Sequence, residues 1–130
     1  MREENSPFVF LVEDNPFFAG ALKYDISLTI TKNVKVFSTG EECLRNICLN
    51  PDVVLLDYDL AGDLNGIGVL EKIKEKNVHI PVVFISACEK LEVAANALNY
   101  GAYDYIVKNE LAFIRAKDLI GKIMTRKCLV

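Results

Sequence analysis

The sequence lacks the features that mark several large classes of protein. Tryptophan is absent, histidine occurs once, and no two cysteines form a Cys-x-x-Cys pair. Zinc sites need clustered cysteine and histidine ligands, so a zinc-binding module is not expected. Disulfide frameworks belong mainly to secreted chains, so the cysteines are expected to be buried or incidental thiols. They are Cys43, Cys48, Cys88 and Cys128.

Long apolar runs and an excess of basic residues are also missing. No run approaches the ~20 apolar residues that cross a bilayer, and the opening MREENSP lacks the apolar stretch of a secretory signal. The net charge of -3 gives no general reason to bind nucleic acid, which calls for a basic patch. We therefore expect a cytoplasmic protein that contacts neither membrane nor nucleic acid directly.

The composition that is present fits one globular domain. The chain has 130 residues, of which 52% are hydrophobic and 25% are charged. This size and composition are typical of a single folded unit with a real core. No repeat, linker or low-complexity segment divides the chain, so residues 1–130 are expected to form one domain.

Short apolar runs alternate with amphipathic stretches five times along the chain. The apolar runs, which predict strands, are Phe8–Val12, Val34–Phe37, Val53–Leu56, Val82–Ile85 and Tyr103–Val107. The amphipathic stretches, which predict helices, are residues 16–29, 40–49, 66–76, 89–100 and 110–126. Such alternation within one domain predicts an α/β fold, in which helices cover both faces of a parallel sheet.

The composition of the five runs predicts their order in the sheet. The first, third and fourth runs are continuously apolar, as strands buried on both faces must be. The second (VKVF) and the fifth (YDYIV) each carry a charge, which suits edge strands. The order 2-1-3-4-5 satisfies both conditions and is that of a flavodoxin-like, doubly wound sheet, here with five strands and five helices. Ligands of such sheets bind beyond the carboxyl ends of the strands, where the first and third strands meet.

Local signals predict where several helices begin and end. Asn15 and Pro16 supply an N-cap and a first-turn proline, and Ser38 with Glu41 fits a capping box. Gly101 stands where a glycine C-cap of the fourth helix belongs. One apolar stripe on that helix is predicted from Leu91, Ala94, Ala95 and Leu98.

The residues that follow the strands lie at the edge of the sheet where a ligand would bind. They are Glu13 and Asp14 after the first run, Asp57 and Asp59 after the third, Ser86 and Ala87 after the fourth, and Lys108 after the fifth. Because the first and third strands are neighbours in the inferred order, three carboxylates converge on one small cleft. Packed like charges raise one another's pKa or recruit a cation. Hard oxygen ligands without histidine or cysteine favour Mg²⁺, which keeps several waters and pairs with phosphate.

Each of these residues has a purely structural interpretation when it is taken alone. Asp14 could be a helix cap, Asp57 could start a turn, and Lys108 could be a solvated surface charge. Ser86 with Glu89 matches a capping box for the fourth helix. No structural reason places an acidic pair, an aspartate, a hydroxyl and a lysine, in that order, at the ends of four separate strands. The combination therefore favours a functional site.

The motifs FVFLVEDN, DVVLLDYDL, PVVFISA and DYIVKNE resemble the receiver domain of two-component response regulators, and the resemblance covers essentially the whole chain. By this resemblance Glu13 and Asp14 match the acidic pair that holds Mg²⁺. Asp57 matches the phosphoacceptor and a further metal ligand. The main-chain carbonyl of Asp59 would complete the metal shell.

The resemblance also implies roles for the residues after the fourth and fifth strands. Ser86, Ala87 and Lys108 would bind the phosphoryl group, and Ser86 with Tyr105 would form the switch. Phosphorylation would draw the Ser86 hydroxyl toward the phosphoryl oxygens, and the Tyr105 ring would turn into the vacated space. The surface that then changes, for an output partner or a second copy, comprises residues 89–100, 103–107 and 110–126. The structural alternative is that Tyr105 simply covers the core as an edge-strand aromatic.

These roles predict a phosphoacceptor signalling domain rather than an enzyme. The donor would be a phosphohistidine on a sensor histidine kinase or on a histidine phosphotransfer protein. Mg²⁺ and Lys108 would neutralise the oxygens of the transferred group, and Asp57 would carry it as an aspartyl phosphate. The domain would assist its own phosphorylation and dephosphorylation without multiple turnover of a substrate.

Two segments depart from the family pattern. The family usually has proline after the lysine, but this chain has Lys108-Asn109. After the phosphoacceptor the family usually has proline at the fourth position and glycine at the eighth. Here Ala61 takes the proline position, and Gly66 falls at the ninth position after Asp57. The loop beside the phosphorylation site is therefore expected to be one residue longer, which bears on dephosphorylation rate and partner choice.

Two other functions fit parts of the sequence. LLDYDL also resembles the Asp-x-Asp motif of haloacid-dehalogenase-type phosphatases, but there the motif normally follows the first strand, and Glu13 and Asp14 would have no role. Turnover of p-nitrophenyl phosphate would identify such an aspartate-nucleophile phosphatase. A phosphate-independent, receiver-like interaction module would keep the fold without the chemistry. Labelling by acetyl phosphate distinguishes it from a phosphoacceptor.

Overall fold

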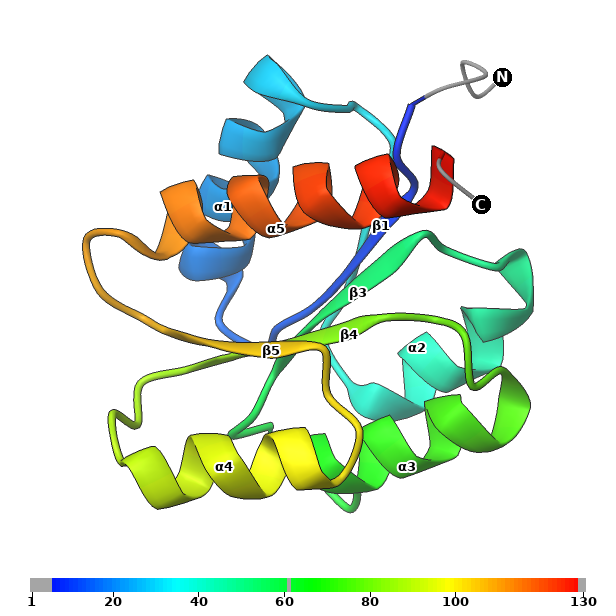
Figure 1. The fold of residues 1–130 in the computed structure, drawn as a ribbon, viewed down its shortest axis with the longest axis vertical. Helices are drawn as coiled ribbons and strands as arrows, with labels where there is room; N and C mark the ends of the chain where they lie inside the picture. Colours follow the sequence, from blue (N-terminus) through cyan, green and yellow to red (C-terminus); the bar gives the residue numbers. More distant parts are fainter. Residues whose placement is uncertain (1–5, 61, 129–130) are drawn as a thin grey trace.

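The computed structural model describes residues 6–60 and 62–128. The strands are β1 (Val9–Val12), β2 (Val34–Phe37), β3 (Val53–Asp57), β4 (Val82–Ser86) and β5 (Asp104–Val107). The helices are α1 (Pro16–Thr29), α2 (Gly40–Asn46), α3 (Gly66–Lys76), α4 (Leu91–Asn99) and α5 (Ala112–Cys128), with a short 3-10 helix, η1 (Ile47–Leu49), after α2. The strands pair in parallel in the order β2-β1-β3-β4-β5 (Figure 1). The flavodoxin-like order predicted from the apolar runs is confirmed.

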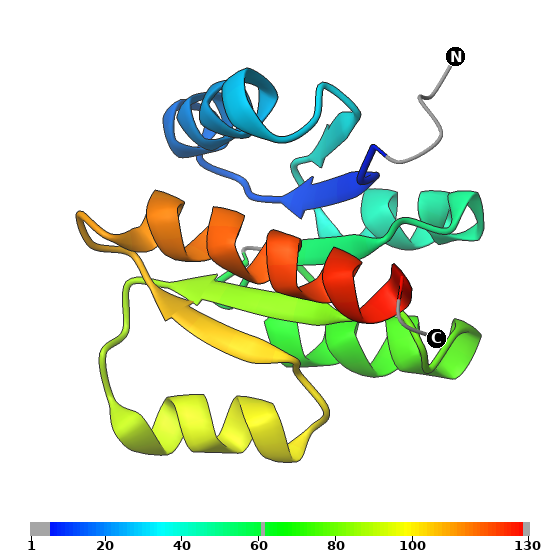
Figure 2. The same ribbon diagram turned by 45° about the horizontal axis from the view of Figure 1, so that its top comes forward.

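Helices cover both faces of the sheet, as the continuously apolar central strands require. α1 and α5 lie on one face and α2, α3 and α4 on the other (Figures 1 and 2). Successive residues of each central strand point to opposite faces. Phe10 and Leu56 therefore pack under α2, α3 and α4, while Leu11 and Leu55 pack under α1 and α5. The two apolar layers hold the central strands in one fixed register.

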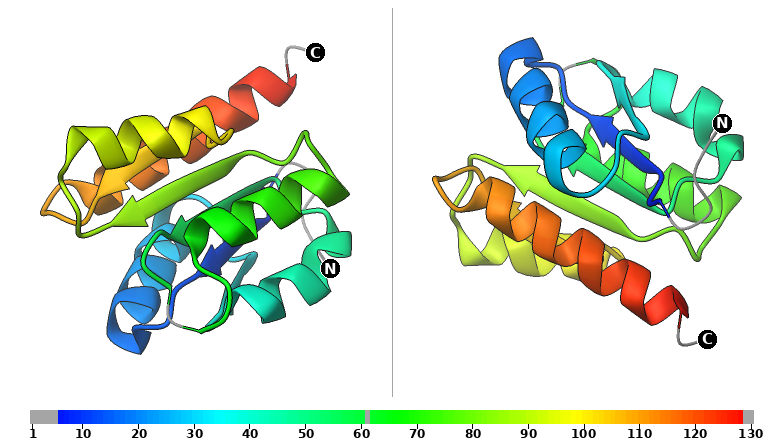
Figure 3. Two further views of the ribbon diagram at one scale, coloured as in Figure 1. Left: turned by 90° about the horizontal axis from the view of Figure 1, so that it is seen from below. Right: turned by 90° about the horizontal axis from the view of Figure 1, so that it is seen from above.

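The edge strands carry the charges that sequence reasoning assigned to edges. In β2, Lys35 and Val36 are exposed, and β5 begins with the half-buried Asp104. In contrast, every residue of β1, β3 and β4 is buried. β2 and β5 are the outer strands of the sheet, which Figure 3 shows from its two helix-covered faces.

The predicted starts of α1 and α2 are confirmed, but the predicted cap of α2 is wrong by one residue. The Asn15 side chain accepts hydrogen bonds from the N–H groups of Phe17 and Phe18, and Pro16 occupies the first turn. The cap of α2 is Thr39, whose hydroxyl accepts from the N–H of Glu42 at 3.2 Å. Thr39, rather than Ser38, is the extended residue directly before the helix, and only that position brings a side-chain oxygen to the open N–H groups.

The predicted apolar stripe of α4 is confirmed only at Ala94. Leu91 and Leu98 are 81% and 47% exposed. The residues that face the core are Val93, Ala94 and Ala97. The helix starts at Leu91 instead of residue 89 and lies against the sheet through small side chains, which leaves its leucines in solvent. Gly101 does end this helix, with φ 106° and its N–H bonded to the Leu98 carbonyl.

Two smaller expectations concern the membrane and the cysteines. No helix within residues 6–60 and 62–128 is both long and apolar enough to cross a bilayer.

All four cysteines are free thiols. Cys43, on the inner side of α2, is fully buried, and burial raises its pKa to about 12. The thiol of Cys43 is therefore a core group, as expected.

Candidate functional site

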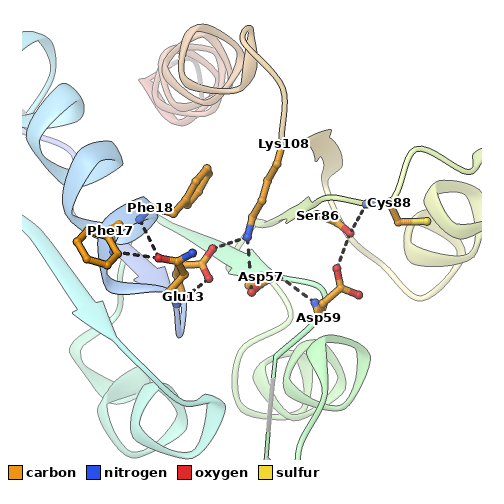
Figure 4. A network of polar contacts seen from close by, with 9 residues as sticks. Glu13, Phe17, Phe18, Asp57, Asp59, Ser86, Cys88 and Lys108 are labelled. Atoms are coloured by element: carbon orange, nitrogen blue, oxygen red, sulfur yellow. Dashed lines mark hydrogen bonds and ion pairs between the residues drawn. The ribbon is translucent and has the colours of Figure 1, made fainter.

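The strand register brings the predicted site residues together at the carboxyl edge of the sheet. Val12 lies opposite Leu56, so Glu13 and Asp57 continue side by side from β1 and β3. Ser86 ends β4 opposite Val107, and Lys108 follows directly. Figure 4 shows Glu13, Asp57, Ser86 and Lys108 pointing into one region from these four strand ends. The convergence predicted from sequence is present.

Three carboxylates form a compact acidic group. Glu13, Asp14 and Asp57 each offer an oxygen, and these oxygens lie within 4.8 Å of one another. Glu13 and Asp57 are buried, whereas Asp14 is exposed. The Glu13 carboxylate is held by the N–H of Asn15, which donates to its Oε2 at 3.1 Å. Two fixed, buried carboxylates therefore stand behind one that faces solvent.

This group has the donor chemistry for Mg²⁺. All of its ligand atoms are carboxylate oxygens, which suit a hard cation. The exposure of Asp14 leaves one side open for the waters that Mg²⁺ retains. The residues therefore fit the metal that the sequence predicted.

Lys108 supplies the positive charge at the site. Its Nζ lies 2.7 Å from Glu13 Oε1 and 3.8 Å from Asp57 Oδ2. The ammonium also sits over the Phe18 ring, 4.5 Å from the centroid, where it gains a cation–π attraction. The backbone is fixed as well, because the N–H of Lys108 donates to the Ser86 carbonyl at 2.7 Å.

Asn109 replaces proline without loosening this lysine. The side chain of Asn109 accepts a hydrogen bond from the N–H of Leu111 at 2.9 Å, and its carbonyl accepts from the N–H of Ala112. These bonds form an Asx-type turn into α5. The described residues contain no cis peptide bond, and Lys108 reaches both carboxylates from a trans backbone.

The environment of Asp57 disfavours its charged form relative to a solvated aspartate. Burial, with a smaller contribution from the Glu13 carboxylate, raises the pKa of its carboxyl to about 6, against the lowering effects of the Asp59 N–H and of Lys108. The Asp59 N–H donates to Asp57 Oδ1 at 3.0 Å. A carboxylate this poorly stabilised gains more from a bound cation than a solvated one does. The electrostatics of Asp57 thus match a metal-dependent group.

Sequence reasoning missed the side chain of Asp59. The Ser86 hydroxyl donates to Asp59 Oδ2 at 2.9 Å, and the N–H of Cys88 donates to Ser86 Oγ at 3.1 Å (Figure 4). Because Ser86 is engaged in this way and α4 starts at Leu91, the capping box with Glu89 is wrong. The spacing Asp-x-Asp was the available signal, since the second aspartate lies only two residues past the strand end.

Tyr105 lies inside the molecule. It is 6% exposed, and its hydroxyl donates to the Cys88 carbonyl at 2.9 Å. Its ring stacks edge-on against Tyr58, with the centroids 6.0 Å apart. Burial raises the pKa of the Tyr105 hydroxyl. Ala87, the other residue predicted to meet a phosphoryl group, is exposed directly after Ser86.

The lengthened loop returns to the site at Gly66. The N–H of Gly66 donates to the Tyr58 carbonyl at 3.3 Å. A Cβ at this position would lie 2.8 Å from the Tyr58 backbone and 2.9 Å from the Phe84 ring. Gly66 is therefore required for the close approach of α3 to the end of β3. Ala61, at the usual proline position, lies outside the described residues.

Comparison with known proteins identifies the family. The strand order and a site at the switch point between β1 and β3 define the class of flavodoxin-like α/β domains. Residues 9–120 match the response regulator receiver domain family. This chain belongs to that family.

Individual relatives agree with this assignment. Regulatory protein LuxO of Vibrio cholerae is 32% identical over 99 residues, which are 75% of this chain and 21% of LuxO. The receiver domain of NtrX from Brucella abortus has a TM-score of 0.81 and 26% identity, covering 90% of this chain and 98% of that one. A CheX–CheY–BeF3–Mg complex from Borrelia burgdorferi has a TM-score of 0.80 and 27% identity, covering 91% and 90%. The chain thus spans about a fifth of the curated relative and nearly all of the isolated receiver domain.

Proposed function

We propose that the chain is a phosphoacceptor signalling domain in which Asp57 receives a phosphoryl group from a phosphohistidine. The donor is a sensor histidine kinase or a histidine phosphotransfer protein. One observation carries the proposal. A buried aspartate of raised pKa lies beside two further carboxylates and a lysine, at the ligand-binding edge of a receiver fold. The expected cytoplasmic location, without direct contact to nucleic acid, remains a prediction.

The chain's own groups supply most of what the transfer needs. Asp57 Oδ1 accepts the Asp59 N–H, and Oδ2, on the side of Lys108, is the oxygen that would attack phosphorus. The P–N bond of the donor breaks, its electron pair stays on the imidazole, and a P–O bond to Asp57 forms. Lys108, 3.8 Å from Oδ2, is placed to neutralise charge on the transferred group. Ser86 and the neighbouring Ala87 stand on the other side, where a hydroxyl and a main-chain N–H can bind its oxygens.

A bound Mg²⁺ would offset the negative charge of the carboxylates and of the incoming phosphoryl group. Glu13, Asp14, Asp57 and the main-chain carbonyl of Asp59 are the proposed ligands. The carboxylate cluster supports this assignment. The structurally similar Borrelia complex, in which BeF3 and Mg accompany a CheY protein, is in keeping with it.

The output surface is proposed to be that of α4, β5 and α5. Tyr105 lies in β5, and its hydroxyl bonds to the loop before α4, so a change at Ser86 reaches both elements. Exposed apolar side chains on or beside these elements offer a contact area to a second copy or an output partner. They are Leu91, Leu98, Tyr100, Leu111 and Ile114. We do not expect multiple turnover of a substrate, since one phosphoryl group per chain is the signal.

Labelling with acetyl phosphate and Mg²⁺ tests the proposal. The wild-type protein should gain one phosphoryl group by intact mass, and Asp57→Asn should gain none. Asp52→Asn is the matched control, because Asp52 stands just before β3 while Asp57 ends it. A wild-type protein that stays unmodified, while a control receiver is labelled, would contradict the proposal. So would full labelling of Asp57→Asn.

A further inference from the structure

A continuous chain of hydrogen bonds connects Asp57 to Tyr105. The Asp59 N–H donates to Asp57 Oδ1, and the Ser86 hydroxyl donates to Asp59 Oδ2. The Cys88 N–H then donates to Ser86 Oγ, and the Tyr105 hydroxyl donates to the Cys88 carbonyl. Figure 4 shows the part of this chain from Asp57 to Cys88. Asp59 is the member that joins the β3 end to the β4 end.

The Asp59 carboxylate occupies a chemical role that a phosphoryl oxygen would also fill. Ser86 is fully buried, so its hydroxyl must donate to some acceptor. A hydroxyl carries one proton and can satisfy one strong acceptor at a time. An anionic acceptor makes the bond stronger than a neutral one would. Asp59 and a phosphorylated Asp57 therefore compete for the same proton.

We propose that Asp59 is a positioning residue that serves as a built-in substitute acceptor for Ser86. Through Ser86 and Cys88 it holds the Tyr105 ring in its inward place while Asp57 carries no phosphoryl group. The exposed location of Asp59 suits this role, because the displaced carboxylate can turn into water once phosphoryl oxygens take the Ser86 proton. Phosphorylation then replaces the Asp59 carboxylate by a phosphoryl oxygen as the acceptor of the Ser86 proton, in a protein whose Tyr105 ring already points inward.

Two variants separate the hydrogen bond from the charge. Asp59→Asn keeps an oxygen that can accept from Ser86, whereas Asp59→Ala removes the acceptor. Neither alters the main-chain N–H that reaches Asp57 or the carbonyl proposed for the metal. In Asp59→Ala the ratio of inward to outward Tyr105 should fall about fivefold, as expected for one lost hydrogen bond. In Asp59→Asn it should stay near the wild-type ratio.

The measurement is ¹⁹F NMR of full-length protein carrying 3-fluorotyrosine, without phosphate or metal, with Tyr105 assigned through Tyr105→Phe. Asp59→Ala should shift the Tyr105 signal and Asp59→Asn should not. Ser86→Ala should cause a similar shift, and the double variant Asp59→Ala/Ser86→Ala should add nothing beyond it. An unchanged Tyr105 signal in Asp59→Ala would overturn the proposal, and so would additive shifts in the double variant.

Adding beryllofluoride and Mg²⁺ gives a second arm, which rests on the proposed function. The Tyr105 signal of Asp59→Ala should return to the wild-type position, because the bound group supplies the missing acceptor. If no variant responds to beryllofluoride, the phosphoacceptor assignment fails while the role of Asp59 stands. If beryllofluoride acts but Asp59→Ala has left Tyr105 unmoved, the role of Asp59 fails while the phosphoacceptor assignment stands.

Discussion

The strand β3 has an aspartate at each end, and the two carboxylates have opposite electrostatic environments. Asp52, at the amino end, accepts from the Phe8 N–H at 2.8 Å and pairs with Lys127 at 2.9 Å. The charged form of Asp57, at the carboxyl end, is disfavoured by burial and by the Glu13 carboxylate, and its pKa rises to about 6. The Asp52 carboxylate therefore stabilises the fold, whereas the buried charge of Asp57 lowers the free energy of unfolding.

The contrast extends to the two edges of the sheet. At the amino edge the Asp52 charge is met by a cation and a donor from two other segments of the chain. At the carboxyl edge three carboxylates cluster, and Lys108 Nζ lies 2.7 Å from that of Glu13 but 3.8 Å from that of Asp57. Clustered carboxylates with a raised pKa at Asp57 are what a metal or phosphoryl site uses, and the surroundings of Asp52 show that the fold itself does not demand them.

The largest expected effect is on metal binding. Glu13→Gln and Asp14→Asn should each weaken Mg²⁺ binding by about 10- to 100-fold, since even outer-shell changes have effects of that order. Asp52→Asn should leave the affinity unchanged, because its carboxylate belongs to the other edge. Isothermal titration calorimetry measures all three. Unchanged affinity in both Glu13→Gln and Asp14→Asn would remove these residues from the metal site.

Removing each aspartate of β3 should change the metal-free stability in opposite directions. Asp57→Asn should raise the free energy of unfolding at pH 7 by about 1–2 kcal/mol, because it replaces a buried, charged carboxylate by a neutral amide. Asp52→Ala should lower it by about 1–2 kcal/mol, because the Phe8 N–H loses its acceptor. Lys127→Ala is the control for the ion pair and should cost less than about 1 kcal/mol, since Lys127 is partly exposed. Urea unfolding gives the three values. Changes of the same sign in the free energy of unfolding for Asp57→Asn and Asp52→Ala would contradict the contrast between the two aspartates.

The smallest effect is a pH dependence of the Asp57→Asn gain. Asp57 has a folded-state pKa above the ordinary 3.8, so its contribution favours folding at low pH and is lost as the pH rises through about 6. The gain of Asp57→Asn over wild type should therefore grow by about 1 kcal/mol between pH 5 and pH 7 in metal-free buffer. Paired urea unfolding curves at the two pH values measure it. A gain that shrinks as the pH rises would contradict a raised pKa.

Most of the site was predictable because strand ends are simple to locate. Buried parallel strands are continuously apolar, so the first charged residue after each run marks the edge of the sheet. That rule alone brought together Glu13, Asp57 and Lys108, which the structure joins by contacts of 2.7 and 3.8 Å. The helix-start signal at Asn15 worked for the same reason, since a cap is defined by neighbours in sequence.

The wrong predictions concern features that depend on tertiary contacts. The stripe of α4 was wrong at all positions but Ala94, because periodicity identifies apolar faces without saying which one meets the sheet, and here Val93 and Ala97 flank Ala94 on that face. The bond between Ser86 and Asp59 crosses 27 positions in sequence, and no local pattern reports such a pair. The capping interpretations of Ser38 and Ser86 failed because serine offers the same donor and acceptor to many partners.

The contact between Gly66 and Tyr58 has a consequence for how this site can vary. Residues 58 and 66 are tied by a backbone hydrogen bond and by an approach that admits no Cβ, so the segment between them is a loop with pinned ends. Adding one residue to a loop of this size changes its closure free energy by only about 0.1 kcal/mol. Insertions can therefore accumulate beside Asp57 while the strand and α3 stay in place. Under the proposed function, the lifetime of a phosphorylated Asp57 could then change in evolution almost independently of the stability of the domain.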